Sequence, residues 1–132
     1  MRRRAAWALA CIFVAFSIVG VLKPAYAAVG CRVAYTVPSQ WQGGFQAAIT
    51  VTNLGDPLNG WTLGFSFGGD QHVGNVWGAT ASQSGSAVTL ANLPWDAAIA
   101  AGATINVVGM TGTWTASDAA PSGFVLNGVR CS

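Results

Sequence analysis

The sequence predicts an all-β protein, an antiparallel β-sandwich of the jelly-roll or immunoglobulin-like kind. Three observations lead to this fold class. Apolar and polar residues alternate along most of the chain, turn-forming residues separate the alternating runs at short intervals, and no window carries the 3.6-residue apolar stripe of an amphipathic helix. Several short strands at this spacing are typical of two antiparallel sheets packed face to face.

The alternating runs define eight expected strands. In the first, residues 31–37, the side chains of Cys31, Val33 and Tyr35 share one face. Residues 45–51 and 61–67 repeat this pattern, which indicates half-buried antiparallel strands. Shorter candidates follow at residues 73–76, 80–83, 87–91, 104–108 and 124–129. Gly, Asn, Asp, Ser and Pro fill the connections between them, as turns require.

The first 27 residues have the organisation of a secretory signal peptide. The basic start Met1-Arg2-Arg3-Arg4 precedes an apolar run over residues 5–22, and the segment ends in Ala25-Tyr26-Ala27. We therefore expect residues 1–27 to be removed, leaving one secreted, extracellular domain over residues 28–132. An uncleaved membrane anchor is the alternative, because the apolar run is slightly longer than is usual for a signal.

Loss of the signal reverses the sign of the net charge. The whole chain carries 6 Lys and Arg against 4 acidic residues, a net charge of +2. After cleavage only Arg32 and Arg130 remain against the four aspartates, so the net charge becomes −2. Two arginines cannot form the basic patch that nucleic acid or an anionic membrane requires, so we expect neither as a partner.

The cysteine count also resolves once the signal is removed. Of the 3 cysteines, Cys11 lies in the signal, and Cys31 and Cys131 stand at the two ends of the remaining domain. In an exported protein two such cysteines are expected to pair. A closed loop of this length is worth roughly 4.7 kcal/mol in the chain-entropy model.

The sequence offers no catalytic set, no metal site and no cofactor site. A glycoside hydrolase normally needs two facing carboxylates, but the chain has no Glu. Its aspartates lie in turn-like sequence, namely Asp56, Asp70, Asp96 and Asp118. The single histidine, His72, has no second histidine or free cysteine to join it in a nucleophilic or zinc-binding arrangement.

Tryptophans in polar surroundings are the main functional signal. Trp61 opens an alternating strand and is predicted to lie in the core. Trp41, Trp77 and Trp95 stand instead among polar or turn residues, where they either cap the sandwich or face solvent. A face of exposed rings needs a ligand, and a flat, neutral polymer of sugars fits stacked rings flanked by amides.

The residues from Cys31 to Cys131 resemble the family 2 carbohydrate-binding modules, the cellulose-binding domains of bacterial cellulases and xylanases. The resemblance rests on motifs that run through the domain in order: Gln40-Trp41-x-x-Gly44-Phe45, Thr52-Asn53-x-Gly55, Asn59-Gly60-Trp61-Thr62-Leu63, Gln83-Ser84-Gly85-Ser86-Ala87-Val88-Thr89, Pro94-Trp95, Ala101-Gly102 and Ala120-Pro121-x-x-Phe124-x-Leu126-Asn127-Gly128.

The resemblance implies a sandwich of about nine strands closed by a terminal disulfide. It also implies a planar strip of three tryptophans, which maps onto Trp41, Trp77 and Trp95, and a buried tryptophan, which maps onto Trp61. Polar positions beside the strip fall on Asn75, Asn106 and Ser39, with Pro38-Ser39 looking like a one-residue insertion. One further amide position of the family falls on Ala48, so that contact is expected to be lost.

Gly44 separates two subgroups of the resembling family. Xylan-binding members carry an arginine three residues after the first tryptophan, which props that ring upright. Gly44 stands there in this chain and lets the ring lie flat, as in the cellulose-binding members.

We therefore expect a monomeric, non-catalytic module that adsorbs to cellulose or a related β-1,4-linked polysaccharide such as chitin. The sequence leaves open a small glycoside hydrolase component acting on O-glycosyl bonds, and an adhesin that uses the same strip. It also leaves open whether Trp114 is rim, core or a fourth contact.

Overall fold

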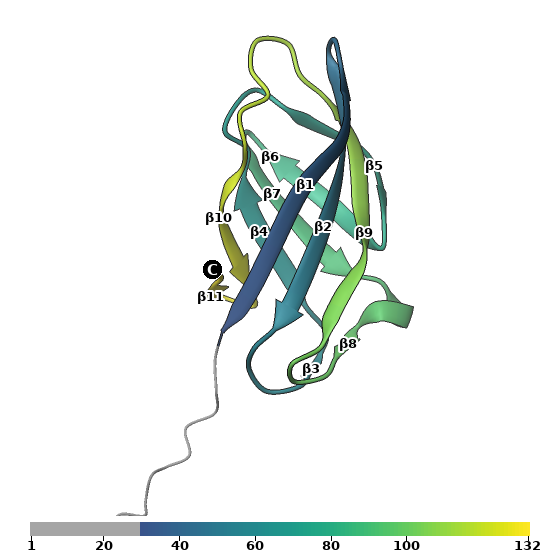
Figure 1. Cartoon of the computed structure of the whole chain (residues 1–132), viewed down its shortest axis with the longest axis vertical. Helices are drawn as coiled ribbons and strands as arrows, with labels where there is room; N and C mark the ends of the chain where they lie inside the picture. Colours follow the sequence, from purple (N-terminus) through teal and green to yellow (C-terminus); the bar gives the residue numbers. More distant parts are fainter. Residues whose placement is uncertain (1–29) are drawn as a thin grey trace, which may run out of the picture.

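The computed structural model describes residues 30–132, so the expected signal peptide, residues 1–27, lies outside the described residues. Two antiparallel sheets pack face to face (Figure 1). The elements are β1 (Cys31–Trp41), β2 (Gly44–Asn53), β3 (Leu58–Asn59), β4 (Thr62–Ser66), β5 (His72–Trp77), β6 (Ala79–Ser84), β7 (Ala87–Asn92), the 3-10 turn η2 (Pro94–Asp96), β8 (Ala98–Ile99), β9 (Thr104–Thr113), β10 (Ser122–Leu126) and β11 (Val129–Arg130).

The front sheet has the strand order β1-β2-β9-β5, and the back sheet has the order β11-β10-β4-β7-β6. A short third ladder joins β3 to β8. Every strand pair is antiparallel, which confirms the predicted sandwich. Each of the eight longer strands overlaps one of the eight expected segments. The expected strand over residues 124–129 is wrong in its bounds, because a turn at Asn127 and Gly128 divides it into β10 and β11. The two strands that were not expected, β3 and β8, have two residues each and are too short to show an alternation.

Several strands are longer than their sequence pattern predicts, and two of the extensions carry predicted tryptophans. β1 continues from Val37 through a bulge to Trp41, and β5 continues to Trp77, so both tryptophans lie on strand ends rather than in turns. β9 continues to Thr113, although the apolar alternation fades after Val108. Beyond Val108 the outward side of β9 carries Gly109, Thr111 and Thr113, which show no apolar alternation. On the inward side Met110 lies in the core and Gly112 lies against the ring of Phe45.

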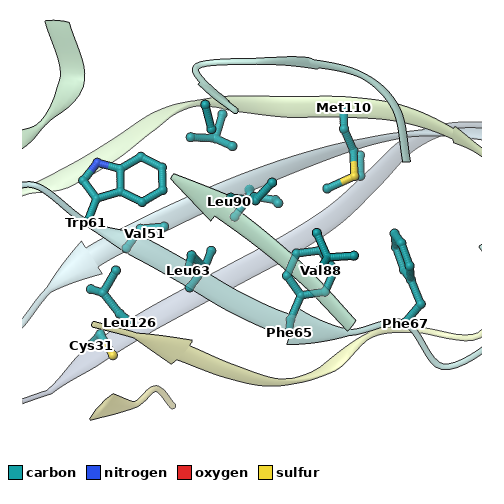
Figure 2. Packing of buried hydrophobic residues seen from close by; sticks show 14 of the residues in the cluster. Cys31, Val51, Trp61, Leu63, Phe65, Phe67, Val88, Leu90, Met110 and Leu126 are labelled. Atoms are coloured by element: carbon teal, nitrogen blue, oxygen red, sulfur yellow. The ribbon is translucent and has the colours of Figure 1, made fainter. Parts of the chain in front are cut away.

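The core fills the space between the two sheets (Figure 2). Trp61 is 2% exposed, which confirms its predicted burial, and it packs at one end of the core with Leu63 and Val51. Phe65 and Phe67 form the other end, with their rings 5.4 Å apart in an edge-to-face arrangement. Within residues 30–132, no helix is long and apolar enough to cross a membrane.

The two ends of the described domain are joined as the cysteine count predicts. A disulfide links Cys31 to Cys131 across a sequence separation of 100, and the two Cα atoms lie 4.6 Å apart. Backbone hydrogen bonds reinforce the join, since the amide of Ser132 donates to Cys31 at 2.9 Å and that of Val33 donates to Ser132 at 3.0 Å. The bridge lies beside β11, far from the β1–β2 hairpin at the opposite end of the sandwich (Figure 1).

Candidate binding face

The outer face of the front sheet brings two of the three predicted tryptophans together. Residues paired directly across antiparallel strands share a face. Trp41 on β1 pairs with Gly44 on β2, and Gly44 pairs with Thr113 on β9. On the other edge of the sheet, Trp77 on β5 pairs with Gly109 on β9. Gly109 and Thr113 are four residues apart on one strand, so both tryptophans lie on the same, solvent-facing side.

The indole of Trp41 lies flat across the backbone of Gly44. A Cβ atom built on Gly44 would come within 2.8 Å of Trp41 Cζ2 and 2.5 Å of its Cε2, so the ring occupies the space of the missing side chain. Gly44 is therefore buried although it points outward, while 51% of Trp41 is exposed. The tight turn that carries this pair is completed by Gly43, whose φ of +81° favours glycine.

Trp77 repeats this arrangement on the neighbouring strand. A Cβ atom on Gly109 would come within 2.5 Å of both Cε2 and Cζ2 of Trp77, so this ring also lies across a facing glycine. Gly109 is buried beneath the ring, and 43% of Trp77 remains exposed. No sequence pattern singles out Gly109, because only the strand register places this glycine opposite Trp77.

The two rings are separated along the sheet by a row of polar side chains. Gly109 and Thr113 mark the two ring levels on β9, and four residues of strand span roughly 14 Å. Between them Ser39 pairs with Gln46, and Gln46 pairs with Thr111. A bulge on β5 sets Gly74 and Asn75 opposite Thr111, and the backbone N–H of Asn75 donates to Thr111 Oγ1 at 3.3 Å. The predicted polar residues Ser39 and Asn75 thus lie between the rings.

Other residues on this face were missed or fall at its edges. Gln46 was already on the outward side of the β2 alternation, whereas Thr111 escaped notice because β9 was expected to end at Val108. His72 pairs with Thr113 and so shares the level of Trp41. Asn106 and the exposed Val107 lie in a bulge of β9 beyond the Trp77 level, and Ala48 lies opposite Gly109 without an amide to offer.

Trp95 reaches solvent from the turn η2 rather than from the sheet. It is the most exposed of the three predicted tryptophans, at 66%. The turn is anchored to the core because the buried indole Nε1 of Trp61 donates to the Asp96 carbonyl at 2.9 Å. The Asp96 carboxylate closes the same turn by accepting the Leu93 amide at 2.7 Å. In Figure 1 this turn follows β7 at the lower right, on the side of the sandwich where β5 ends.

The hairpin that carries Trp41 is braced by the loop between β9 and β10. The Trp114 amide donates to the Gly43 carbonyl at 3.2 Å, and Gln40 Nε2 donates to the Asp118 carboxylate. Trp114 itself is half-buried against the core, with its indole nitrogen enclosed and without a partner among the described residues. It therefore supports the hairpin from within and adds no ring to the outer face.

Asp70 holds the loop between β9 and β10 in its conformation. Its carboxylate accepts the backbone amides of Ala116 at 2.9 Å and of Ser117 and Thr115 at 3.1 Å. These donors, with Ala116 the strongest contributor, hold the pKa of Asp70 below its ordinary value. The carboxylate of Asp70 thus serves to hold the backbone of this loop in place.

The rows that carry Trp41, Trp77 and the polar side chains between them contain no Lys, Arg, Asp or Glu. Within residues 30–132 no group of three or more His, Cys, Asp or Glu side chains is placed to hold a metal ion. Asp96, the aspartate nearest a tryptophan in sequence, is 6% exposed; its Oδ1 closes its own turn, and its Oδ2 is enclosed without a partner among the described residues. The face is suited to stacking and hydrogen bonding with an uncharged ligand.

A β-sandwich that lays indoles flat on an uncharged outer face defines a carbohydrate-binding module, a class of non-catalytic domain. The model of the family described as "Cellulose binding domain" matches residues 31–131, and the chain belongs to this family. This is the family that the sequence motifs resemble.

Named relatives and solved structures agree with the assignment. The chain is 47% identical to Endoglucanase CelA of Streptomyces lividans over 129 residues, covering 94% of this chain and 28% of the relative. It is 47% identical to Exoglucanase A of Cellulomonas fimi over 104 residues, covering 78% of this chain and 12% of the relative. The chain thus spans less than a third of the length of these curated relatives.

Two solved domains match over nearly their whole length. The chitin-binding domain of Chi18aC from Streptomyces coelicolor is 32% identical with a TM-score of 0.64, covering 80% of this chain and 97% of that one. The cellulose-binding family 2 domain from ScLPMO10C is 31% identical with a TM-score of 0.55, covering 75% of this chain and 96% of that one.

Proposed function

We propose that this domain adsorbs to cellulose or a related β-1,4-linked polysaccharide through the aromatic strip formed by Trp41, Trp77 and Trp95. The observation that carries the proposal is the flat seating of two indoles on facing glycines. A ring that lies along the sheet presents its whole outer face to solvent, and that face stacks on the C–H face of a pyranose unit. Rings held in this way lose little conformational freedom on binding.

Hydrogen bonding complements the stacking in this proposal. Asn75 lies between the two ring levels and Asn106 lies beyond the Trp77 level, so both amides can reach the equatorial hydroxyls of a chain that runs along the strip. Gln46 and Thr111 add two more polar groups between the rings. Because these groups are uncharged, they suit a neutral polymer and give no preference to an ionic one.

The glycine at position 44 favours a flat polysaccharide surface, rather than a twisted polysaccharide chain, as the ligand. A side chain at this position would lift the Trp41 ring from the sheet, and the glycine leaves it in place. This favours the surface of an insoluble polymer, on which neighbouring units lie in a plane, as the ligand.

Alanine substitution of each tryptophan tests the proposal. Trp41→Ala, Trp77→Ala and Trp95→Ala should each weaken adsorption to microcrystalline cellulose by about 1–2 kcal/mol, the range of an aromatic hot spot. Circular dichroism should show an unchanged fold, because all three side chains are on the surface. Full adsorption by all three variants would refute the strip as the binding site.

Chitin is the second candidate ligand, favoured by the 32% identity and TM-score of 0.64 to a chitin-binding domain. It has the same β-1,4-linked backbone, and its acetamido groups add hydrogen-bonding partners for the amides. Depletion assays on chitin and cellulose in parallel rank the two. Adsorption to neither polymer would contradict the proposed function.

We also propose that residues 1–27 act as a signal peptide and that residues 28–132 work outside the cell as a monomer. The disulfide between Cys31 and Cys131 supports an oxidising compartment. N-terminal sequencing and light scattering of the secreted protein test the cleavage after Ala27 and the oligomeric state.

A further inference from the structure

A cavity of about 160 Å³ opens at the end of the sandwich that carries the β1–β2 hairpin. It lies between the inner side of that hairpin and the loop connecting β9 to β10, both of which are at the top of Figure 1. Tyr35, Phe45 and Pro121 contribute apolar walls, and Gln40 and Asp118 contribute polar groups. It is separate from the strip, because Gln40 and Trp41 point to opposite sides of β1.

The size of the cavity fits a six-membered ring. An apolar protein cavity of about 150 Å³ accommodates benzene. The present cavity is comparable in volume and open to solvent, so the substituents of a bound ring can project outward. A polymer could therefore enter by its terminal unit, whereas the side of an intact crystalline surface could not.

The polar groups of the cavity have hydrogen-bonding capacity left over. The Asp118 carboxylate accepts Gln40 Nε2 through one oxygen, and its other oxygen has no partner among the described residues. The Tyr35 hydroxyl likewise makes no hydrogen bond within residues 30–132. Burial raises the pKa of Tyr35 to about 12, so its hydroxyl remains a donor at ordinary pH. The side chain of Gln71 is already hydrogen-bonded within the protein, because its Oε1 accepts the Gly69 amide and its Nε2 donates to the Ala119 carbonyl.

We propose that this cavity is a second carbohydrate site, which takes one neutral pyranose unit at the end of a glucan chain. The hydroxyls of a sugar can donate to Asp118 and accept from Tyr35, while the C–H face of the ring lies against Phe45 and Pro121. The negative charge of Asp118 disfavours uronic acids. The choice of a glucan, rather than another neutral sugar, rests on the proposed function of the strip.

The test is a titration of the full chain with cellobiose, followed by ¹H–¹⁵N correlation spectra. The backbone amides of Val37, Gln40 and Ala120 should shift and saturate with a roughly millimolar dissociation constant, as expected for a ligand of this size. The same shifts should persist in Trp77→Ala, and glucuronic acid should not produce them. Shifts confined to the strip tryptophans, or absent altogether, would overturn the inference.

A matched pair of variants separates the cavity from the strip. Ala120→Leu fills the cavity and should weaken the cellobiose shifts at least ten-fold, whereas Ala116→Leu, on the same loop but outside the cavity, should leave them unchanged. Equal shifts in both variants would also overturn the inference. Adsorption to cellulose without cavity shifts would leave the strip proposal standing, and cavity shifts without adsorption would remove the strip proposal while supporting this site.

Discussion

Substitution of Gly44 by alanine should impair binding without impairing folding. The new Cβ atom would come within 2.5 Å of Trp41 Cε2 and 2.8 Å of Cζ2. Carbon atoms settle at about 3.5–4.0 Å, so the indole must move by roughly 1 Å or more. The backbone at Gly44 cannot move away, because it is held by the hairpin and by the facing strand. The exposed ring of Trp41 therefore tilts outward and leaves the plane of the strip.

The size of the effect is bounded by the contribution of the ring itself. A tilted Trp41 loses part of its stacking, so Gly44→Ala should weaken adsorption to cellulose by about 1–2 kcal/mol, a factor of roughly 5 to 30, and by no more than Trp41→Ala does. Stability should change by less than about 1 kcal/mol, because the φ of Gly44 lies outside the left-handed region and alanine restricts the unfolded chain.

Adsorption isotherms on microcrystalline cellulose, paired with denaturant unfolding, measure both quantities. Gly64→Ala is the matched control, because its Cβ would lie 3.8 Å from the nearest atom, the carbonyl oxygen of Val88, on the back sheet. In a Trp41→Ala background, Gly44→Ala should have no further effect. Unchanged affinity for Gly44→Ala in the wild-type background would refute the idea that flat seating of the ring matters.

Three further predictions concern stability and the bracing of the face. Reduction of the disulfide between Cys31 and Cys131 should lower the free energy of unfolding by roughly 4.7 kcal/mol, measured by urea denaturation with and without reductant. Asp70→Asn should destabilise the domain at neutral pH. Because the folded pKa of Asp70 is depressed, wild-type stabilisation is complete above its ordinary value of 3.8 and is lost as pH falls through the folded pKa, so the two unfolding curves should converge in acid; a constant difference would contradict this. Trp61→Phe should lower the free energy of unfolding by about 2 kcal/mol or more, because it removes the hydrogen bond to Asp96. It should also weaken adsorption, because that bond anchors the turn that carries Trp95. A folded Trp61→Phe variant with normal adsorption would disprove this.

The sandwich and its closure were predictable because they depend on local pattern. Alternation along residues 31–37, 45–51 and 61–67 reports which side of each strand is buried, and it needs no knowledge of the partner strand. The disulfide followed from the number of cysteines left after an expected cleavage. Trp61 was assigned to the core because it begins one of these alternating runs.

Features that depend on strand register could not be predicted from the sequence pattern. The segment "VGMTGT" contains two glycines, and nothing in its pattern distinguishes Gly109 from the other. Only the pairing of β5 with β9 places Gly109 under Trp77. Thr111 and His72 join the face for the same reason. Trp41 looked like a turn residue because of its polar neighbours, yet it ends a strand whose outer face is solvated.

The central claim is that a neutral aromatic face, and not charge, holds this domain to an insoluble polysaccharide. Its most direct test is an adsorption isotherm on cellulose at low and high salt, for the wild-type protein and for the variant with Trp41, Trp77 and Trp95 all replaced by alanine. Because no counterions are released, wild-type affinity should change by no more than about two-fold between roughly 0.05 and 1 M salt, and the triple variant should stay in solution. A steep loss of wild-type adsorption with salt, or retained adsorption by the triple variant, would contradict the claim.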